Sequence, residues 1–186
     1  TGCNSTLVEL SYDNVLSRLQ KLVQYHDSPI ATISYLVHSM LSEEIKKKGY
    51  RVAFSGTSAD ELFTGYYDHF LLHLNMARES SEYTQYLNDW KKNILQYVRN
   101  PDLRNPDLYK ERPDYREHVF DNSAEFAGCL KVPFEEVFIE ETFTCNLLRN
   151  RMMNELFHEV TPVILHEDDL DSMYYSIENR SPYLDS

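Results

Sequence analysis

Residues 33–63 place a helical pattern, a glycine, a short β-favouring run and a Ser-Gly turn in immediate succession. Apolar residues recur with helical spacing up to Lys48, and Gly49 is placed to end this helix. The following segment YRVAF, residues 50–54, is typical of a buried strand, and Ser55-Gly56 turns the chain into another helix. A helix, a strand and a second helix in this order outline an α/β crossover, which predicts a parallel sheet.

The residues before this segment predict one more strand and one more helix. Thr6 to Leu10 is a β-favouring run, and apolar residues recur with helical spacing from Asn14 to Val23. Pro29 separates this helix from the next one, because proline removes a backbone hydrogen-bond donor and its ring clashes with the preceding turn.

The chain after the Ser-Gly turn is predicted to be mostly helical. Residues 101–118 carry three prolines among charges and predict an exposed, irregular excursion. Helical patterns cover the segments around it, namely residues 68–100, 132–141, 146–162 with an end before Pro162, and 169–178 with an end at Asn179.

The length of 186 residues and the hydrophobic fraction of 42% suit one folded domain. We predict a single partial domain over residues 1–186, with an α/β part in residues 1–75 and a helical part in residues 76–186. The chain opens on TGCNSTLVEL, without Met, which leads us to expect a fragment. The expected fold class is α/β, mostly helical, with part of a parallel sheet and a helical extension.

Charge and cysteine content narrow the classes of partner. A net charge of −12 and a pI near 4.9 argue against a nucleic-acid surface, which needs clustered Lys and Arg. The three cysteines are far apart and form no CxxC pair, which favours neither a disulfide framework nor a zinc site. The sequence also lacks an apolar run long enough to span a membrane and a signal-peptide pattern. We therefore expect a cytoplasmic protein without nucleic-acid or membrane partners.

The Ser55-Gly56 turn has two interpretations. A helix that begins directly after a strand offers free N–H groups and a positive dipole end, so this turn would suit an anion. Ser58 and Glu61 also have the spacing of a capping box, which would start the helix without any function. Asp60 would repel a bare phosphate there, and a divalent cation shared between carboxylate and phosphate would remove the conflict.

A second polar cluster lies in residues 166–185. Its acids are either metal ligands or solvated residues at the start of a helix: Glu167, Asp168, Asp169 and Asp171. Further on, Glu178 and Arg180, followed by Pro182 and Asp185, suggest a fixed corner that holds an ion pair.

Histidines and aromatic residues after the Ser-Gly turn carry weaker signals. His69 and His73 have the i, i+4 spacing of a metal pair, but the sequence offers no evident third ligand nearby. Tyr66, Tyr67 and Asp68 either line a pocket or simply pack.

Two ordered segments resemble the asparagine synthetase family. SGTSADELFTGYY is similar to the family motif SGEGADELFGGY, and DLDSMYYSIENRSPYLD is similar to DKMSMANSLELRVPFLD. The lead-in segments HDSPIATISYL and KKKGYRVAF also resemble the family. The resemblance covers most of the chain and is weakest from about residue 76 to residue 145.

The resemblance implies part of a synthetase domain of the ATP-pyrophosphatase type, with the adenine-nucleotide α-hydrolase-like fold. Such a domain uses ATP and Mg²⁺ to adenylate a small-molecule carboxylate, and ammonia from a glutaminase domain then forms the amide. By resemblance, Ser55 and Gly56 contact ATP, and Asp60 is a catalytic residue that binds magnesium. Residues that would form the site wall are Glu61, Tyr66, Glu178, Arg180 and Asp185.

Several departures from the family pattern leave alternatives open. The glutaminase domain and the pyrophosphate loop, SGGxDS, are absent from this sequence, so we expect the fragment alone to be inactive. Thr57 stands where the family usually carries an acid or amide, and Leu170 where it carries a cation. The acceptor is aspartate or a related acid, or else a sugar uronate of surface polysaccharide. A catalytically inactive binding or assembly module is the alternative of another class, and a homodimer is left open.

Overall fold

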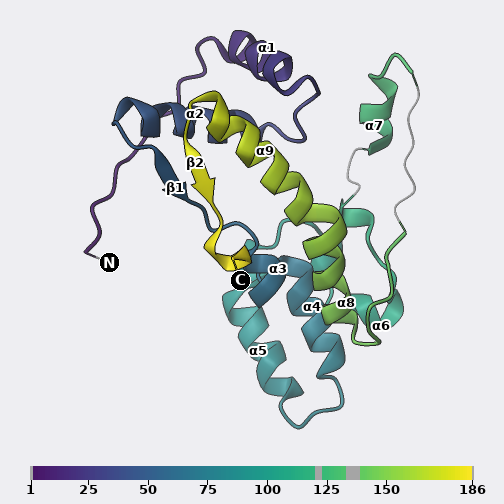
Figure 1. Cartoon of the computed structure of the whole chain (residues 1–186). Coiled ribbons are helices and arrows are strands. Elements are labelled where there is room, and N and C mark those ends of the chain that lie inside the picture. Colours follow the sequence, from purple (N-terminus) through teal and green to yellow (C-terminus); the bar gives the residue numbers. More distant parts are fainter. Residues whose placement is uncertain (1, 120–122, 133–138, 186) are drawn as a thin grey trace. The chain divides into compact units, whose positions relative to one another are not determined.

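Two short strands, β1 (Val52–Phe54) and β2 (Glu178–Arg180), form a parallel sheet in the computed structural model (Figure 1). The structure describes residues 2–119, 123–132 and 139–185. Val52 pairs with Glu178 and Phe54 with Arg180. The ladder extends at both ends, because Glu178 N–H donates to the Arg51 carbonyl at 2.8 Å and Ser55 N–H donates to the Arg180 carbonyl at 2.9 Å. The parallel sheet expected from the sequence is therefore confirmed, and the segment expected as a corner is its second strand.

The strand β1 is more exposed than its apolar sequence predicts. Val52 is 41% exposed and Phe54 is 70% exposed. Among the described residues β2 is the one strand that pairs with β1, so no further strand flanks these side chains. The prediction of a buried strand is wrong for this reason.

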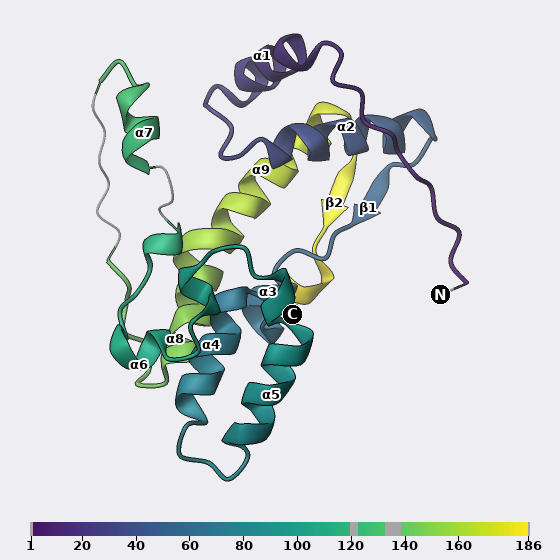
Figure 2. The same cartoon turned by 180° about the vertical axis from the view of Figure 1, so that it is seen from behind.

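The chain divides into two compact units, residues 1–62 with 156–186 and residues 63–155. The first unit contains both strands and three longer helices, α1 (Val15–His26), α2 (Ser34–Lys47) and α9 (Val160–Tyr174). The helix α9 packs against α2 and α1 and also contacts β2, as both views show (Figures 1 and 2). The short helix α3 (Ala59–Phe63) begins in this unit, and a 3₁₀ helix (Pro182–Leu184) follows β2.

The ends of α2 follow the sequence signals closely. Gly49 has a φ of +83°, a left-handed conformation that glycine adopts without strain, and its N–H donates to the Lys46 carbonyl at 2.9 Å.

The strand predicted at Thr6 to Leu10 is wrong, because this segment is irregular and largely exposed. A β-favouring run forms a strand only where a partner strand satisfies its backbone groups.

The helix α9 differs from the prediction at both ends. The sequence predicted one helix ending before Pro162 and a second over 169–178. In the structure a π-helical turn (Glu155–Glu159) follows α8 (Leu147–Asn154), and α9 then runs through Pro162. Pro162 closely follows this π-helical turn, where the regular i→i−4 hydrogen bonding that proline would disrupt is already interrupted. The acids of residues 167–171 therefore lie in the C-terminal half of a helix and not at its start.

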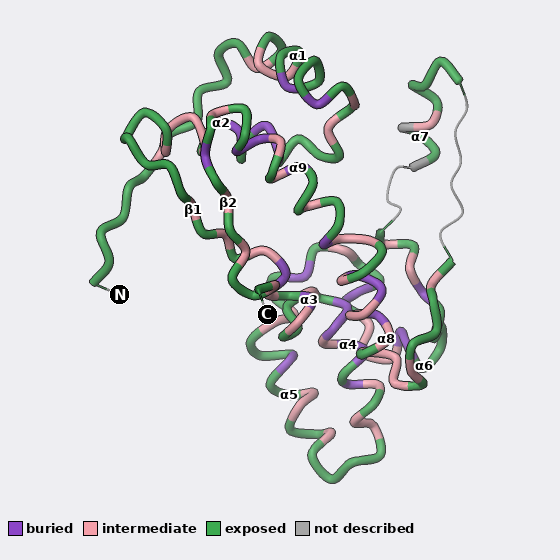
Figure 3. The backbone as a smooth tube through the Cα atoms, in the orientation of Figure 1, coloured by how far each residue is buried: buried purple, intermediate pink, exposed green. Residues whose placement is uncertain are grey.

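The second unit is helical and contains a cluster of buried apolar residues. Figure 3 shows buried residues in purple along its helices. The predicted helix over 68–100 is divided into α4 (Tyr67–Met76) and α5 (Tyr83–Asn93). The other helices among the described residues of this unit are α6 (Leu108–Glu111), α7 (Ser123–Gly128), α8, and 3₁₀ helices at Leu95–Tyr97, Asp102–Arg104 and Glu117–Val119.

The Pro-rich excursion, residues 101–118, differs from the prediction in two ways, because short helical turns interrupt its irregular backbone and it is not fully exposed. Leu103, Leu108, Tyr109 and Tyr115 are each at most 5% exposed and pack with Leu71, Leu72 and Trp90 of α4 and α5. The apolar residues of this segment are too widely spaced for a helical pattern, which is why the sequence did not reveal their burial.

The helix predicted over 132–141 lies mostly outside the described residues. Within the described part of the chain, no helix has the length and apolarity that a membrane crossing requires.

The buried cluster predicts the response to truncation of a leucine. Leu72 is 1% exposed, so Leu72→Ala should lower the free energy of unfolding by about 2–5 kcal/mol, through lost apolar burial and a residual cavity. Leu7→Ala is the matched control, because Leu7 is 87% exposed and its truncation should change this energy by less than about 0.5 kcal/mol. Urea titration of both variants measures the difference, and equal effects would contradict the described core.

Candidate functional site

The parallel register brings the two sequence motifs together in the first unit. Ser55 follows β1 and Ser181 follows β2, so both side chains lie at the carboxyl ends of paired strands. The Ser55 hydroxyl lies 3.2 Å from the Ser181 hydroxyl and 2.9 Å from the Thr57 hydroxyl. Ligands of open α/β sheets bind outside this edge, which makes the three hydroxyls a candidate site.

The capping-box interpretation of Ser58 is wrong. Ser58 has a φ of 71°, in the left-handed region, whereas the first residue of a capping box is extended. Its buried hydroxyl lies 2.9 Å from the Thr161 hydroxyl of α9 and hydrogen-bonds with it. The helix α3 that follows has five residues, so its dipole is too small to define an anion site by itself. A Cβ added at Gly56 would meet nothing within 4 Å, and the backbone there is open to approach.

Thr57 connects the turn to a carboxylate of α9. Its hydroxyl donates to Asp168 Oδ2 at 3.4 Å, and Asp168 Oδ1 lies 2.8 Å from Nδ1 of His38 in α2. An ionised carboxylate can only accept, so Nδ1 carries the proton in this contact. The hydrogen bond to Asp168 raises the pKa of His38 above its ordinary value, although partial burial opposes the shift. The structure therefore places an acid beside Thr57, at the position where the sequence motif itself has none.

The other acids of α9 attach helices to one another. His26 of α1 lies 3.3 Å from Glu167 and 3.4 Å from Asp171, and Glu167 also accepts from the Ala31 N–H at 3.2 Å. Burial and the neighbouring charges of Glu167 and Asp168 raise the pKa of Asp171 to about 7. Negative charge in the C-terminal half of a helix also opposes the helix dipole, so the surroundings of Asp171 disfavour its ionised form.

The remaining predicted site residues are dispersed. Asp60 is exposed on α3, and the hydrogen bonds and ion pairs of the described residues do not include its side chain, whereas Glu61 is 3% exposed. The predicted ion pair is confirmed, because Glu178 Oε1 accepts from Nε and Nη2 of Arg180 at 2.8 Å, on an exposed part of β2. Asp185 is exposed after the 3₁₀ helix.

Tyr66 belongs to the second unit, where it precedes α4, and its ring centroid lies 5.2 Å from that of His69. His73 does not join His69 in a metal pair, because its ring lies against Tyr86 with the centroids 5.0 Å apart. The i, i+4 pattern therefore describes two packing contacts on α4.

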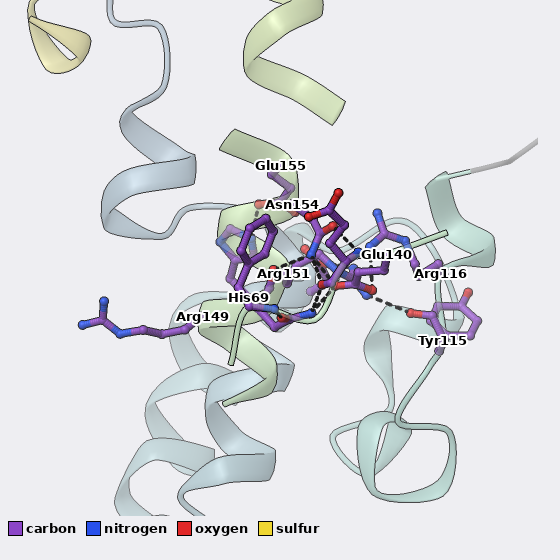
Figure 4. Close-up of polar contacts among 12 residues, drawn as sticks. His69, Tyr115, Arg116, Glu140, Arg149, Arg151, Asn154 and Glu155 are labelled. Atoms are coloured by element: carbon purple, nitrogen blue, oxygen red, sulfur yellow. Dashed lines mark hydrogen bonds and ion pairs between the residues drawn. The ribbon is translucent and has the colours of Figure 1, made fainter. Parts of the chain in front are cut away.

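His69 belongs instead to a buried polar cluster of the second unit (Figure 4). Its Nε2 lies 2.8 Å from Glu155 Oε2, and Asp68 Oδ2 lies 2.7 Å from Arg151 Nη1. Ligand atoms of Asp68, His69 and Glu155 lie within 4.8 Å of one another, which is close enough to hold a metal ion. The sequence could not reveal this group because Glu155 is 86 residues from His69.

The charges in this cluster favour a structural role. Burial alone would raise the pKa of Asp68, but the hydrogen bond from His118 and the charges of His69 and Arg151 hold it below its ordinary value. Burial raises the pKa of Glu155 in spite of its contact with His69. The guanidinium of Arg151 thus already neutralises Asp68 at the position where a metal ion would have to bind.

Comparison with known protein families places the chain in one family of synthetases. A family model of ATP-dependent, amidotransferase-type synthetases matches the whole chain. This model is that of asparagine synthase, and it covers residues 1–186, so the chain belongs to the asparagine synthase family. No curated protein and no solved structure matches the chain.

The contact between His38 and Asp168 predicts a measurable titration. Asp168→Asn removes the negative charge that favours the imidazolium, so the pKa of His38 should fall. NMR titration of the imidazole resonances measures the shift. Asp169→Asn changes the adjacent, exposed acid and should leave this pKa unchanged. An unchanged pKa in Asp168→Asn would contradict the contact.

The buried cluster predicts a large cost for removing its cation. Arg151→Ala removes the permanent cation beside the buried Asp68 and leaves only the weaker contact with His118, so the free energy of unfolding should fall by about 3–5 kcal/mol. Arg149→Ala on the same helix is the control, because Arg149 is exposed and its loss should cost less than about 0.5 kcal/mol. Denaturant titration measures both energies. A metal site would instead show as a rise in melting temperature of the unaltered protein with Mn²⁺ or Zn²⁺.

Proposed function

We propose that this chain is part of an asparagine synthetase-like enzyme that adenylates a carboxylate with ATP and then forms an amide with ammonia from glutamine. The products are the amide, AMP and pyrophosphate. The observation that carries the proposal is the meeting of two motifs 126 residues apart, where Ser55 and Ser181 come within 3.2 Å at the carboxyl ends of paired strands. Membership in the asparagine synthase family supports the same reaction class.

The residues at this edge are suited to a nucleotide. The Ser55 and Ser181 hydroxyls can donate to phosphate or ribose oxygens, and the open backbone at Gly56 allows a ligand to approach closely. The proposed role of Asp60 fits its exposed and unengaged carboxylate, since Mg²⁺ commonly takes one or two carboxylates together with substrate phosphates. When bound, magnesium would offset phosphate charge during adenylation. Glu61, Glu178, Arg180, Asp185 and Tyr66 remain proposed wall residues.

Aspartate or a related acid is our first proposal for the acceptor, and a sugar uronate is the second. Thr57 and Leu170 depart from the family pattern at two positions, and this observation keeps the second acceptor open. The proposal also includes a glutaminase domain of the same protein that supplies ammonia. A cytoplasmic location and a homodimeric assembly are further parts of it. The opposing hypothesis is an inactive relative that serves as a binding module.

Pyrophosphate release tests the proposed function. The full-length protein with ATP, Mg²⁺, ammonia and a panel of carboxylates that includes aspartate and uronates should release pyrophosphate with at least one of them. Asp60→Asn should reduce the release at least about a hundredfold, because it removes the proposed ligand at the centre of developing charge. Asp114→Asn, an exposed acid outside the site, is the control and should retain the rate. Absence of release with every carboxylate would favour the inactive relative, and full activity of Asp60→Asn would contradict the role of Asp60.

A further inference from the structure

The His38–Asp168 pair is a polar group that neither sequence motif predicted as a site. His38 comes from α2 and Asp168 from α9, 130 residues later, and they meet beside the Ser-Gly turn. The imidazole is the outer member, because its side chain is 47% exposed, and the carboxylate is the inner member, with 11% exposed. An accessible imidazole oriented by a shielded carboxylate is a common arrangement of a general base.

The contact leaves one ring nitrogen available. Nδ1 is engaged with Asp168 Oδ1, and the interactions of the described residues do not include Nε2. In the neutral imidazole a proton on Nδ1 leaves a lone pair on Nε2, so this tautomer can accept a proton from a substrate. The opposite oxygen of Asp168 accepts from Thr57, whose hydroxyl lies 2.9 Å from that of Ser55. A chain of hydrogen bonds therefore connects His38 to the turn at which the proposed function places the nucleotide.

We propose that His38, oriented by Asp168, accepts the proton from the attacking ammonia during amide formation. In this step, which rests on the proposed function, the nitrogen forms a bond to the acyl carbon of the adenylate, and the proton that it loses passes to Nε2 of His38. The bond between the acyl carbon and the phosphate oxygen then breaks, and its electron pair leaves with AMP. The side chain of Thr57 has no basic group. In this proposal His38 of α2, with Asp168 of α9, supplies the base.

The electrostatic surroundings suit this role. The titratable groups that face His38 are Asp168 and Asp171 of α9 and Tyr35 of its own helix, whose ring centroid lies 5.5 Å away. The hydrogen bond to Asp168 and the charges of both acids raise the pKa of His38 above its ordinary value, which makes the imidazole a stronger base. The rate of amide formation, expressed per free ammonia, should therefore rise with pH as His38 loses its proton.

His38→Asn separates catalysis from helix packing. The asparagine amide can still donate to Asp168, whereas no atom takes the place of Nε2. In the full-length protein we expect carboxylate-dependent ATP–pyrophosphate exchange to be unchanged, since adenylation does not need the base. Amide formation from ammonia should fall about 10²–10⁴-fold, and its pH dependence should flatten. His166→Asn, an exposed histidine of α9, is the control and should change neither reaction.

A second variant tests the positioning role of Asp168. Asp168→Asn should move the acidic limb of the amide-formation profile to lower pH, by the same amount as the pKa of His38 measured by NMR. Full amide formation in His38→Asn with intact exchange would overturn the inference alone. An unmoved profile in Asp168→Asn would do the same. Absence of exchange in the unaltered protein would overturn the proposed function, and this inference with it.

Discussion

The backbone pairing between β1 and β2 is the constraint on which the candidate site depends. Hydrogen bonds at both ends of the ladder fix the register, so that Phe54 and Arg180 are opposite one another. Parallel strands leave the sheet at the same edge, and the residue after each strand is a serine. A shift of one residue would turn the side chains of β2 to the opposite face and separate Ser181 from Ser55.

Local signals predicted much of the first unit, and contacts between distant residues explain what they missed. Gly49 and the Ser55-Gly56 turn marked the boundaries of α2 and β1 to within two residues. The sequence Glu-Asn-Arg of β2 has low β propensity, and it becomes a strand because β1 offers hydrogen-bonding partners. The pair of His38 and Asp168 has no sequence signature, because their contact depends on how α2 and α9 pack.

Both units balance buried acids with histidine or arginine. In the first unit the acids of α9 oppose the helix dipole, and Asp168 is stabilised by its hydrogen bond with His38 of α2. In the second unit Arg151 stabilises Asp68, and the amide of Asn154 donates to the Glu141 carbonyl at 2.9 Å. Acid clusters in this sequence are therefore better explained by helix packing than by metal binding, which the spacing of the acids could not decide.

The left-handed backbone of Ser58 affects how the turn is attached to α9. A non-glycine residue in this conformation costs about 1–2 kcal/mol, and glycine would avoid that cost. Serine contributes what glycine lacks, namely the hydroxyl that binds Thr161 two turns before Asp168 on α9. The Thr57 hydroxyl donates to Asp168 itself, so adjacent residues of the turn contact α9 at two points about two helical turns apart, which fixes the direction in which the turn lies along this helix.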